Sequence, residues 1–158
     1  MDKPLDIGAK EIVGLRRINR KLRQRLTEIE NIIHDNDVML SMLHHIALLL
    51  LRRPQDWPQR AEMLMRRGMK VSGCRLMVFS ASDKTTAAQT ARLPAGGKPA
   101  QTPLDCKAPK AAVYYHLPIK QGRQAVGLIT FSTRQDKDFI RGDDEFCRRL
   151  AQLLAAAL

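Results

Sequence analysis

The chain has 158 residues, of which 44% are hydrophobic and 27% are charged, so it is long enough for about one globular domain and is not predicted to be disordered. Its formal net charge of +11 favours acidic partners such as nucleic acid, anionic lipid or an acidic protein surface. The three cysteines (Cys74, Cys106 and Cys147) exclude a fully paired disulfide framework and have no metal or redox spacing, which predicts reduced thiols in a cytoplasmic protein.

The sequence predicts no transmembrane segment and no secretion signal. The longest apolar run, IALLLL at 46–51, is far too short to cross a bilayer. The N-terminal residues MDKPLDIGAK lack the apolar stretch of a signal peptide. We therefore expect a soluble protein, or at most one that associates with a membrane surface.

The N-terminal third repeats apolar residues every seven positions, from about Gly8 to Arg53, which is typical of a coiled coil. A single helix cannot bury such a stripe alone, so the pattern predicts a homodimer. A second apolar row widens the stripe (Leu26, Ile33, Leu40 and Ala47), which indicates that the end of the helix also packs on a globular body. The predicted dimer interface consists of Leu15, Ile18, Leu22, Ile29, Ile32, Asn36, Met39 and Leu43.

Asn36 occupies a seam position of this repeat. A buried amide is well satisfied by the same amide of a parallel partner, so Asn36 favours a parallel dimer. Alternatively, Asn36 marks the point where the intermolecular seam ends and the helix begins to pack on its own domain. The sequence alone leaves parallel and antiparallel pairing open.

The segment RRINRKLRQR, 16–25, carries six positive charges on this helix, whereas 26–51 holds four acidic residues and no lysine or arginine. In a dimer these charges form a basic collar, which we expect to bind an anionic partner such as nucleic acid with salt-sensitive affinity. Solvation of the charges, or packing against the acidic stretch of another chain, are the alternatives. The residues of this predicted anionic-partner patch are Arg16, Arg17, Arg20, Lys21 and Arg23.

The rest of the chain, 54–158, predicts a mixed domain. Pro54 ends the long helix, and Asp56 is placed to cap a short helix for which Gly68 is the predicted C′ residue, just after the helix ends. A buried strand follows at 74–82, and 83–112 reads as a long loop with one short helical turn. A hairpin is predicted at 113–134, before a terminal helix with Phe146, Leu150, Leu153, Leu154 and Ala157 on one side. The predicted domains are therefore a dimerisation helix, 1–53, and a compact domain, 54–158.

This order of elements resembles a compact GAF domain behind an N-terminal helix. The motifs that carry the resemblance are the strand QAVGLITFSTR and the tail DFIRGDDEFCRRLAQLLAAAL, while ENIIHDNDVMLSMLHHIALLLL followed by WPQRAEMLMRRGM is similar to bacterial GAF-like proteins grouped as domain of unknown function 484. The resemblance implies an α+β fold, with a GAF/PAS-like antiparallel sheet and flanking helices. It also implies a regulatory or adaptor module that binds a protein partner or a small ligand.

A ligand pocket in such a domain is expected between the sheet and the variable loop. Strand alternation offers six candidates for its lining: Arg75, Met77, Phe79, Tyr115, Ile129 and Phe131. Most of them are equally well explained as core residues.

The sequence gives no sign of a catalytic or metal site, so we expect no enzymatic activity and no cofactor. The neighbours His44 and His45 cannot face one ion as an i, i+4 pair can, and neither His34 nor His116 has an evident partner. The stretch AGGKP, 95–99, lacks the flanking strand and the Ser or Thr of a phosphate-binding loop.

Overall fold

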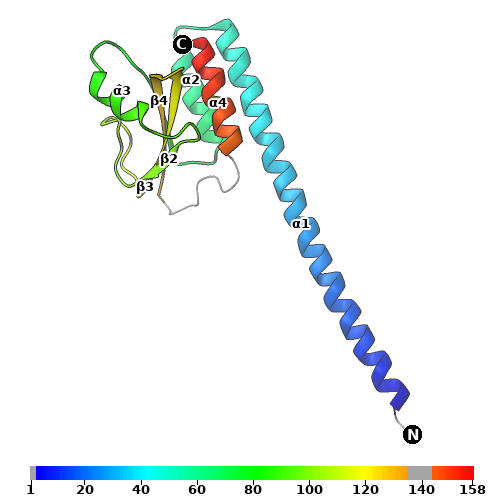
Figure 1. Ribbon diagram of the computed structural model, residues 1–158. Helices are drawn as coiled ribbons and strands as arrows, with labels where there is room; N and C mark the ends of the chain where they lie inside the picture. Colours follow the sequence, from blue (N-terminus) through cyan, green and yellow to red (C-terminus); the bar gives the residue numbers. More distant parts are fainter. Residues whose placement is uncertain (1–2, 135–143) are drawn as a thin grey trace. The chain divides into compact units, whose positions relative to one another are not determined.

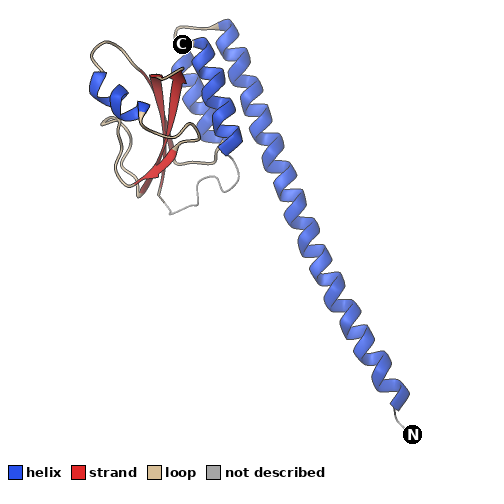
Figure 2. Ribbon diagram, in the orientation of Figure 1, coloured by secondary structure: helices blue, strands red, loops and turns tan. Residues whose placement is uncertain are grey.

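The computed structural model describes residues 3–134 and 144–158, and the side chains of 8–134 and 145–158. It confirms an α+β protein with a long N-terminal helix and an antiparallel sheet with flanking helices (Figure 1 and Figure 2). The first part of the C-terminal motif quoted above, 138–143, lies outside the described residues. The elements in chain order are α1 (Lys3–Arg52), α2 (Trp57–Gly68), β1 (Gly73–Val78), α3 (Lys84–Ala91), β2 (Lys98–Ala100), β3 (Val113–Gln121), β4 (Gln124–Thr133) and α4 (Asp144–Ala157).

The chain divides into two compact units, Met1–Val38 and Met39–Leu158. The division falls within α1 because the side chains of this helix from Met42 onward enter a hydrophobic core. The boundary predicted at 53 and 54 follows the end of the helix instead. The globular unit therefore includes the last turns of α1.

The sheet has the strand order β1-β4-β3-β2, and every pairing is antiparallel. As predicted, β3 and β4 form a hairpin, and its two-residue turn places Gly122 at φ 62°, which glycine adopts without steric cost. Ile119 pairs with Gly127 and Lys120 pairs with Ala125, so Val126 is the extra residue of a β-bulge.

One face of the sheet is covered by helices and forms the core of the globular unit. In Figure 1, α2, α4 and the end of α1 lie on this side, and α3 lies on the other. The alternate residues Tyr115, Leu117 and Ile119 of β3 point into this core, as Ile129 and Phe131 of β4 do. The helices contribute Met42, Ile46, Trp57, Ala61, Met65, Cys147, Leu150, Ala151, Leu154 and Ala155.

The C-terminal helix is amphipathic largely as expected. Leu150 and Leu154 are fully buried, while Phe146 and Leu153 are half-buried and pack against the same core. The hairpin is also tied to this helix, because the side-chain amide of Gln121 donates to the carbonyl oxygen of Ala155 at 2.7 Å.

Two details of α2 differ from the sequence prediction. Asp56 occupies the N-cap position but makes no side-chain capping bond, because its carboxylate accepts a hydrogen bond from Arg60 Nε at 2.8 Å. Gly68 is the last helical residue and not the residue after the helix; the positive φ of 51° falls on Lys70. Glycine suits position 68 for another reason, since a Cβ there would overlap Met42 Sδ on α1 and the Met42 side chain would have to shift.

The segment 83–112 contains more regular structure than predicted. Its Ala- and Thr-rich start forms the eight-residue helix α3, and Lys98–Ala100 forms the edge strand β2. The ammonium group of Lys120 donates to the carbonyl oxygens of Ala91 and Leu93 at the end of α3, at 2.9 and 2.6 Å. Because a short helix alone is marginal, contacts of this kind decide whether it forms.

We expect Ile46→Ala to lower the free energy of unfolding by about 2–5 kcal/mol, because Ile46 is fully buried and its truncation leaves a cavity in the core. The matched control is Leu51→Ala on the same helix, where the side chain is 82% exposed and we expect a loss below about 0.5 kcal/mol. Urea unfolding followed by circular dichroism measures both. Equal losses would show that the end of α1 is not part of this core.

Candidate functional site

The six predicted pocket residues are divided between two faces of the sheet. Tyr115, Ile129 and Phe131 are buried in the core beneath the helices. Arg75 and Met77 pair with Thr130 and Leu128, which places them on the opposite face. Phe79 lies just after β1, where its amide donates to the carbonyl oxygen of Val126. The structure therefore does not bring the six side chains together into one pocket.

The face opposite the helices carries a layer of buried polar side chains, with His116 at its centre. Although the sequence indicated no partner for it, His116 is 2% exposed and has two partners. Nε2 donates to the carbonyl oxygen of Thr102 at 3.2 Å, so in the neutral ring Nδ1 accepts from the hydroxyl of Thr130 at 3.3 Å. The ring of Tyr114 stacks beside it, with 6.4 Å between ring centroids. Burial lowers the pKa of His116, and the Thr102 carbonyl opposes this only in part.

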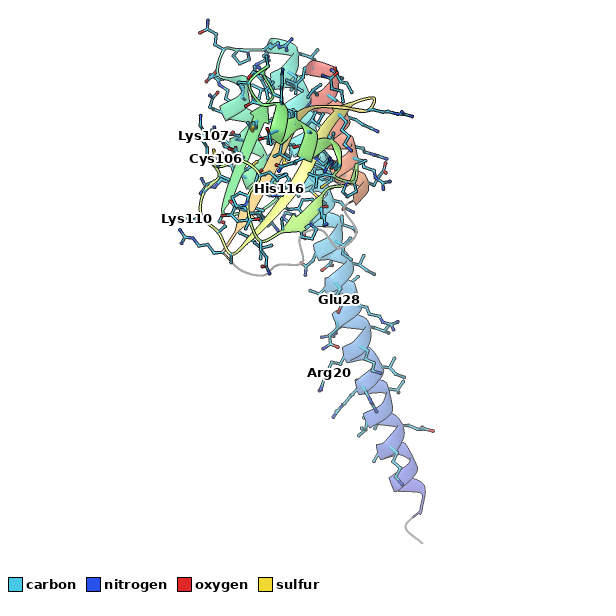
Figure 3. All side chains as sticks on the ribbon, turned by 60° about the vertical axis from the view of Figure 1, so that its left-hand side comes forward. Arg20, Glu28, Cys106, Lys107, Lys110 and His116 are labelled. Atoms are coloured by element: carbon cyan, nitrogen blue, oxygen red, sulfur yellow. The ribbon has the colours of Figure 1, made fainter. Side chains whose placement is uncertain are left out.

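The loop that covers this layer is held by an ion pair. Asp105 is 3% exposed; Oδ2 accepts from Arg75 Nε at 3.3 Å, and Oδ1 accepts from the Lys107 amide at 2.9 Å. Arg75, predicted as an anion anchor, is thus engaged by a carboxylate of its own chain. Figure 3 shows Cys106, Lys107 and Lys110 at the outer side of this loop and His116 over the sheet.

The polar layer is internally satisfied. Among the described side chains, no buried nitrogen or oxygen atom lacks a hydrogen-bond partner. A group that already donates and accepts within the protein gains little from an added ligand. The arrangement therefore acts as a packed polar layer in this conformation.

The three cysteines differ in their surroundings, and none of them forms a disulfide bond. Cys147 is fully buried and Cys106 is exposed. Burial, with a smaller contribution from the negative charge of Glu62, strongly raises the pKa of the Cys74 thiol, which makes it a poor nucleophile. No three His, Cys, Asp or Glu side chains within the described part of the chain are grouped to hold a metal ion.

Among the grooves at the surface of the described part of the globular unit, two bear on binding. The first, of about 470 Å³, is next to Phe79 and is bordered by Lys84, Gln124 and Val126 among others. The second, of about 340 Å³, lies between the end of α1 and α2. Its floor is apolar and its edge is basic: the apolar lining residues are Leu48, Leu49, Pro54, Met63 and Leu64, and the basic ones are His45, Arg52, Arg60 and Arg67.

Sequence reasoning missed the groove between α1 and α2. Periodicity indicates which residues of each helix face outward, and Leu48 and Met63 are indeed 38% and 56% exposed. Periodicity within one helix does not say which residue of a second helix lies opposite. The groove therefore depends on the packing of α1 against α2, which the sequence pattern of either helix does not define.

The predicted seam residues of the first unit, Leu15, Ile18, Leu22, Ile29 and Ile32, are between 53% and 66% exposed. Asn36 is exposed as well, whereas Met39 and Leu43 at the start of the second unit are half-buried. Leu26 and Ile33, from the row that widens the stripe, are 57% and 54% exposed. A monomer of this chain therefore leaves an apolar helix face in water.

The basic cluster of α1 lies around this apolar stripe. A shallow groove of about 820 Å³ runs along the helix and is lined by Leu15, Arg16, Asn19, Arg20, Arg23, Gln24, Thr27 and Glu28. Figure 3 shows side chains projecting from α1 in several directions, with Arg20 and Glu28 labelled. Lys21 and Arg17, from the predicted anionic-partner patch, are exposed but do not line this groove.

No family model matches the chain, and no curated protein matches it either. Within the described residues, no helix combines the length and the apolar character needed to span a membrane.

The lowered pKa of His116 predicts a pH-dependent stability. In the unfolded chain His116 has its ordinary pKa of 6.5 and binds a proton below that pH, whereas in the folded chain its pKa is lower. Acidification therefore favours the unfolded state. We expect the stability of the wild type relative to His116→Gln to fall as the pH decreases through 6.5, and to be constant above it. Urea unfolding across a pH series measures this difference; an increase on acidification would contradict it.

Proposed function

We propose that this protein is a non-catalytic GAF-like regulatory or adaptor module, similar to the proteins of domain of unknown function 484, that forms a homodimer through α1. The observation that carries the proposal is the exposed apolar stripe on the first unit, from Leu15 to Ile33. Full burial of one Leu or Ile side chain is worth about 1.5–3 kcal/mol. A second copy of the same helix offers the complementary surface, since coiled coils bury such stripes against each other.

The globular unit supports the GAF-like part of the proposal through its two unequal sheet faces. One face packs on three helical segments, and the other is covered by α3 and a loop (Figure 2). The groove beside Phe79 is the candidate position for a small ligand. It has one predicted pocket residue in its lining, and Lys84 adds a positive charge.

The groove between α1 and α2 is the candidate position for a protein partner. Its apolar floor suits the apolar face of an amphipathic helix, and Arg52, Arg60 and Arg67 favour acidic residues along the sides of that helix. Asp56 forms an ion pair with Arg60 at 2.8 Å, which reduces the positive charge of the groove edge near Arg60.

Absence of catalysis is proposed because two of the potentially reactive groups, His116 and Cys74, have structural roles. His116 is held by two hydrogen bonds, and the thiol of Cys74 is kept protonated by burial. Because none of the three cysteines forms a disulfide bond, the proposed location is a reducing compartment, the cytoplasm.

We expect the double variant Leu22→Glu/Ile29→Glu to be monomeric where the wild type is dimeric, because charges replace two half-exposed residues of the stripe. Sedimentation velocity at several concentrations gives the mass. The control, Gln24→Glu/Asn31→Glu, adds the same charges at helix positions away from the stripe and should leave the dimer intact. A wild type that stays monomeric at high concentration would remove the proposal.

A second candidate function is binding of nucleic acid by the basic part of α1. It is favoured by Arg16, Arg20 and Arg23, which border one groove on the helix. These guanidinium groups overlap the apolar stripe, so they suit phosphate contacts better than base recognition in a groove of DNA.

If this second function holds, replacing Arg16, Arg17, Arg20 and Lys21 by Gln should lower the affinity for random duplex DNA. The slope of log affinity against log salt should also become shallower, because fewer counterions are released. Fluorescence anisotropy over a salt series measures both quantities. Wild-type protein that fails to bind DNA at low salt would exclude this candidate.

A further inference from the structure

We propose that two copies of α1 pair antiparallel, centred between Thr27 and Glu28, so that the basic segment Arg16–Arg25 of each copy lies along the acidic segment Glu28–Asp37 of the other. The inference rests on the proposed dimerisation and specifies its geometry. The occupant of the exposed helix face is thus a second copy of this chain.

Charge distribution is the first argument. Six basic residues lie in 16–25 and four acidic residues lie in 28–37, all on the first unit. A parallel dimer in register places each segment beside its own copy, so like charges face each other. In the heptad register that has Leu15 in the seam, the parallel dimer also places Arg25 in the seam, directly against the partner's Arg25. An antiparallel dimer with the stated centre brings opposite charges together instead.

The second argument is the spacing of the residues that would meet. The sequence offers a seam with alternating steps of three and four, made by Asn19, Leu22, Leu26, Ile29, Ile33 and Asn36. All six are exposed in the structure. A two-fold axis that passes between Thr27 and Glu28 pairs Leu26 with the partner's Ile29 and Leu22 with the partner's Ile33.

The same two-fold axis gives each of the two seam asparagines a hydrogen-bonding partner. Asn19 pairs with the partner's Asn36, and the two-fold symmetry repeats this pair at the other end. Each amide can then donate to and accept from another amide, which removes the cost of burying it alone. The parallel dimer expected from Asn36 alone provides no such role for Asn19 in its seam.

The positions flanking this seam complete the pattern. On one flank, Arg23 lies near the partner's Glu30 and Arg16 lies near the partner's Asp37, and each ion pair occurs twice by symmetry. On the other flank, the apolar Ile32 lies over the aliphatic stem of the partner's Arg25, whose charge reaches solvent. Arg16 and Arg23 line a groove along α1 that includes the seam residue Asn19, so their side chains lie on one flank of the proposed seam.

Disulfide trapping tests the direction of the helices in full-length protein. In a Cys106→Ser background, which removes the exposed thiol, we introduce Asn19→Cys in one sample and Asn36→Cys in another. Antiparallel pairing predicts little cross-linking in either sample alone and a covalent dimer when the two are mixed. Self-cross-linking of the Asn36→Cys variant alone shows parallel pairing and overturns the inference, while the proposed dimer survives. A monomeric mass in sedimentation overturns both.

Charge reversal provides the second test, with the dimer dissociation constant as the readout. Arg23→Glu and Glu30→Arg should each weaken the dimer about tenfold, because two like-charged pairs form, and the double variant should recover most of the loss. Arg17→Glu, at an outward position, is the matched control and should change the constant less than about threefold. Absence of recovery in the double variant overturns the antiparallel pairing.

Discussion

Packing of helices on a single face of the sheet is the constraint on which the rest of the globular unit depends. Ile46, Met65 and Leu154 come from three helices and all are fully buried against the sheet. The opposite face is consequently left to a loop and to the short helix α3, whose sequence KTTAAQTA has no large apolar side chain. The polar layer around His116, with its internal hydrogen bonds, follows from that shortage.

The elements predicted most accurately from the sequence are those with strong periodicity. The long helix, the β3–β4 hairpin and the amphipathic α4 were recognised because their apolar residues recur at helical or strand spacing. The helix α3 was predicted only as one short helical turn, and strand β2 was missed. They have little periodicity and depend on tertiary contacts, such as the bonds from Lys120 to the end of α3.

The candidate site was predicted less well, for a related reason. Alternation along a strand says that Arg75 and Tyr115 each have a preferred face, but the register between strands decides whether they share it. In the sheet they do not. For α1, by contrast, the exposed stripe could be listed from the sequence, because a heptad pattern within one helix already defines its face. The proposed antiparallel arrangement would place Arg16 and Arg23 in the dimer, so binding of DNA and pairing of helices would compete for the same guanidinium groups.

The contact between Gly68 and Met42 carries a consequence for oxidative damage. Met42 is 4% exposed, and its sulfur lies so close to α2 that the neighbouring helix has no space for a methyl group. Conversion of the thioether to a sulfoxide adds a polar oxygen in this region. Because Met42 is buried, an oxidant and a sulfoxide reductase would each reach its sulfur only when the two helices separate, so both the lesion and its repair would depend on detachment of the end of α1 from the domain that it completes.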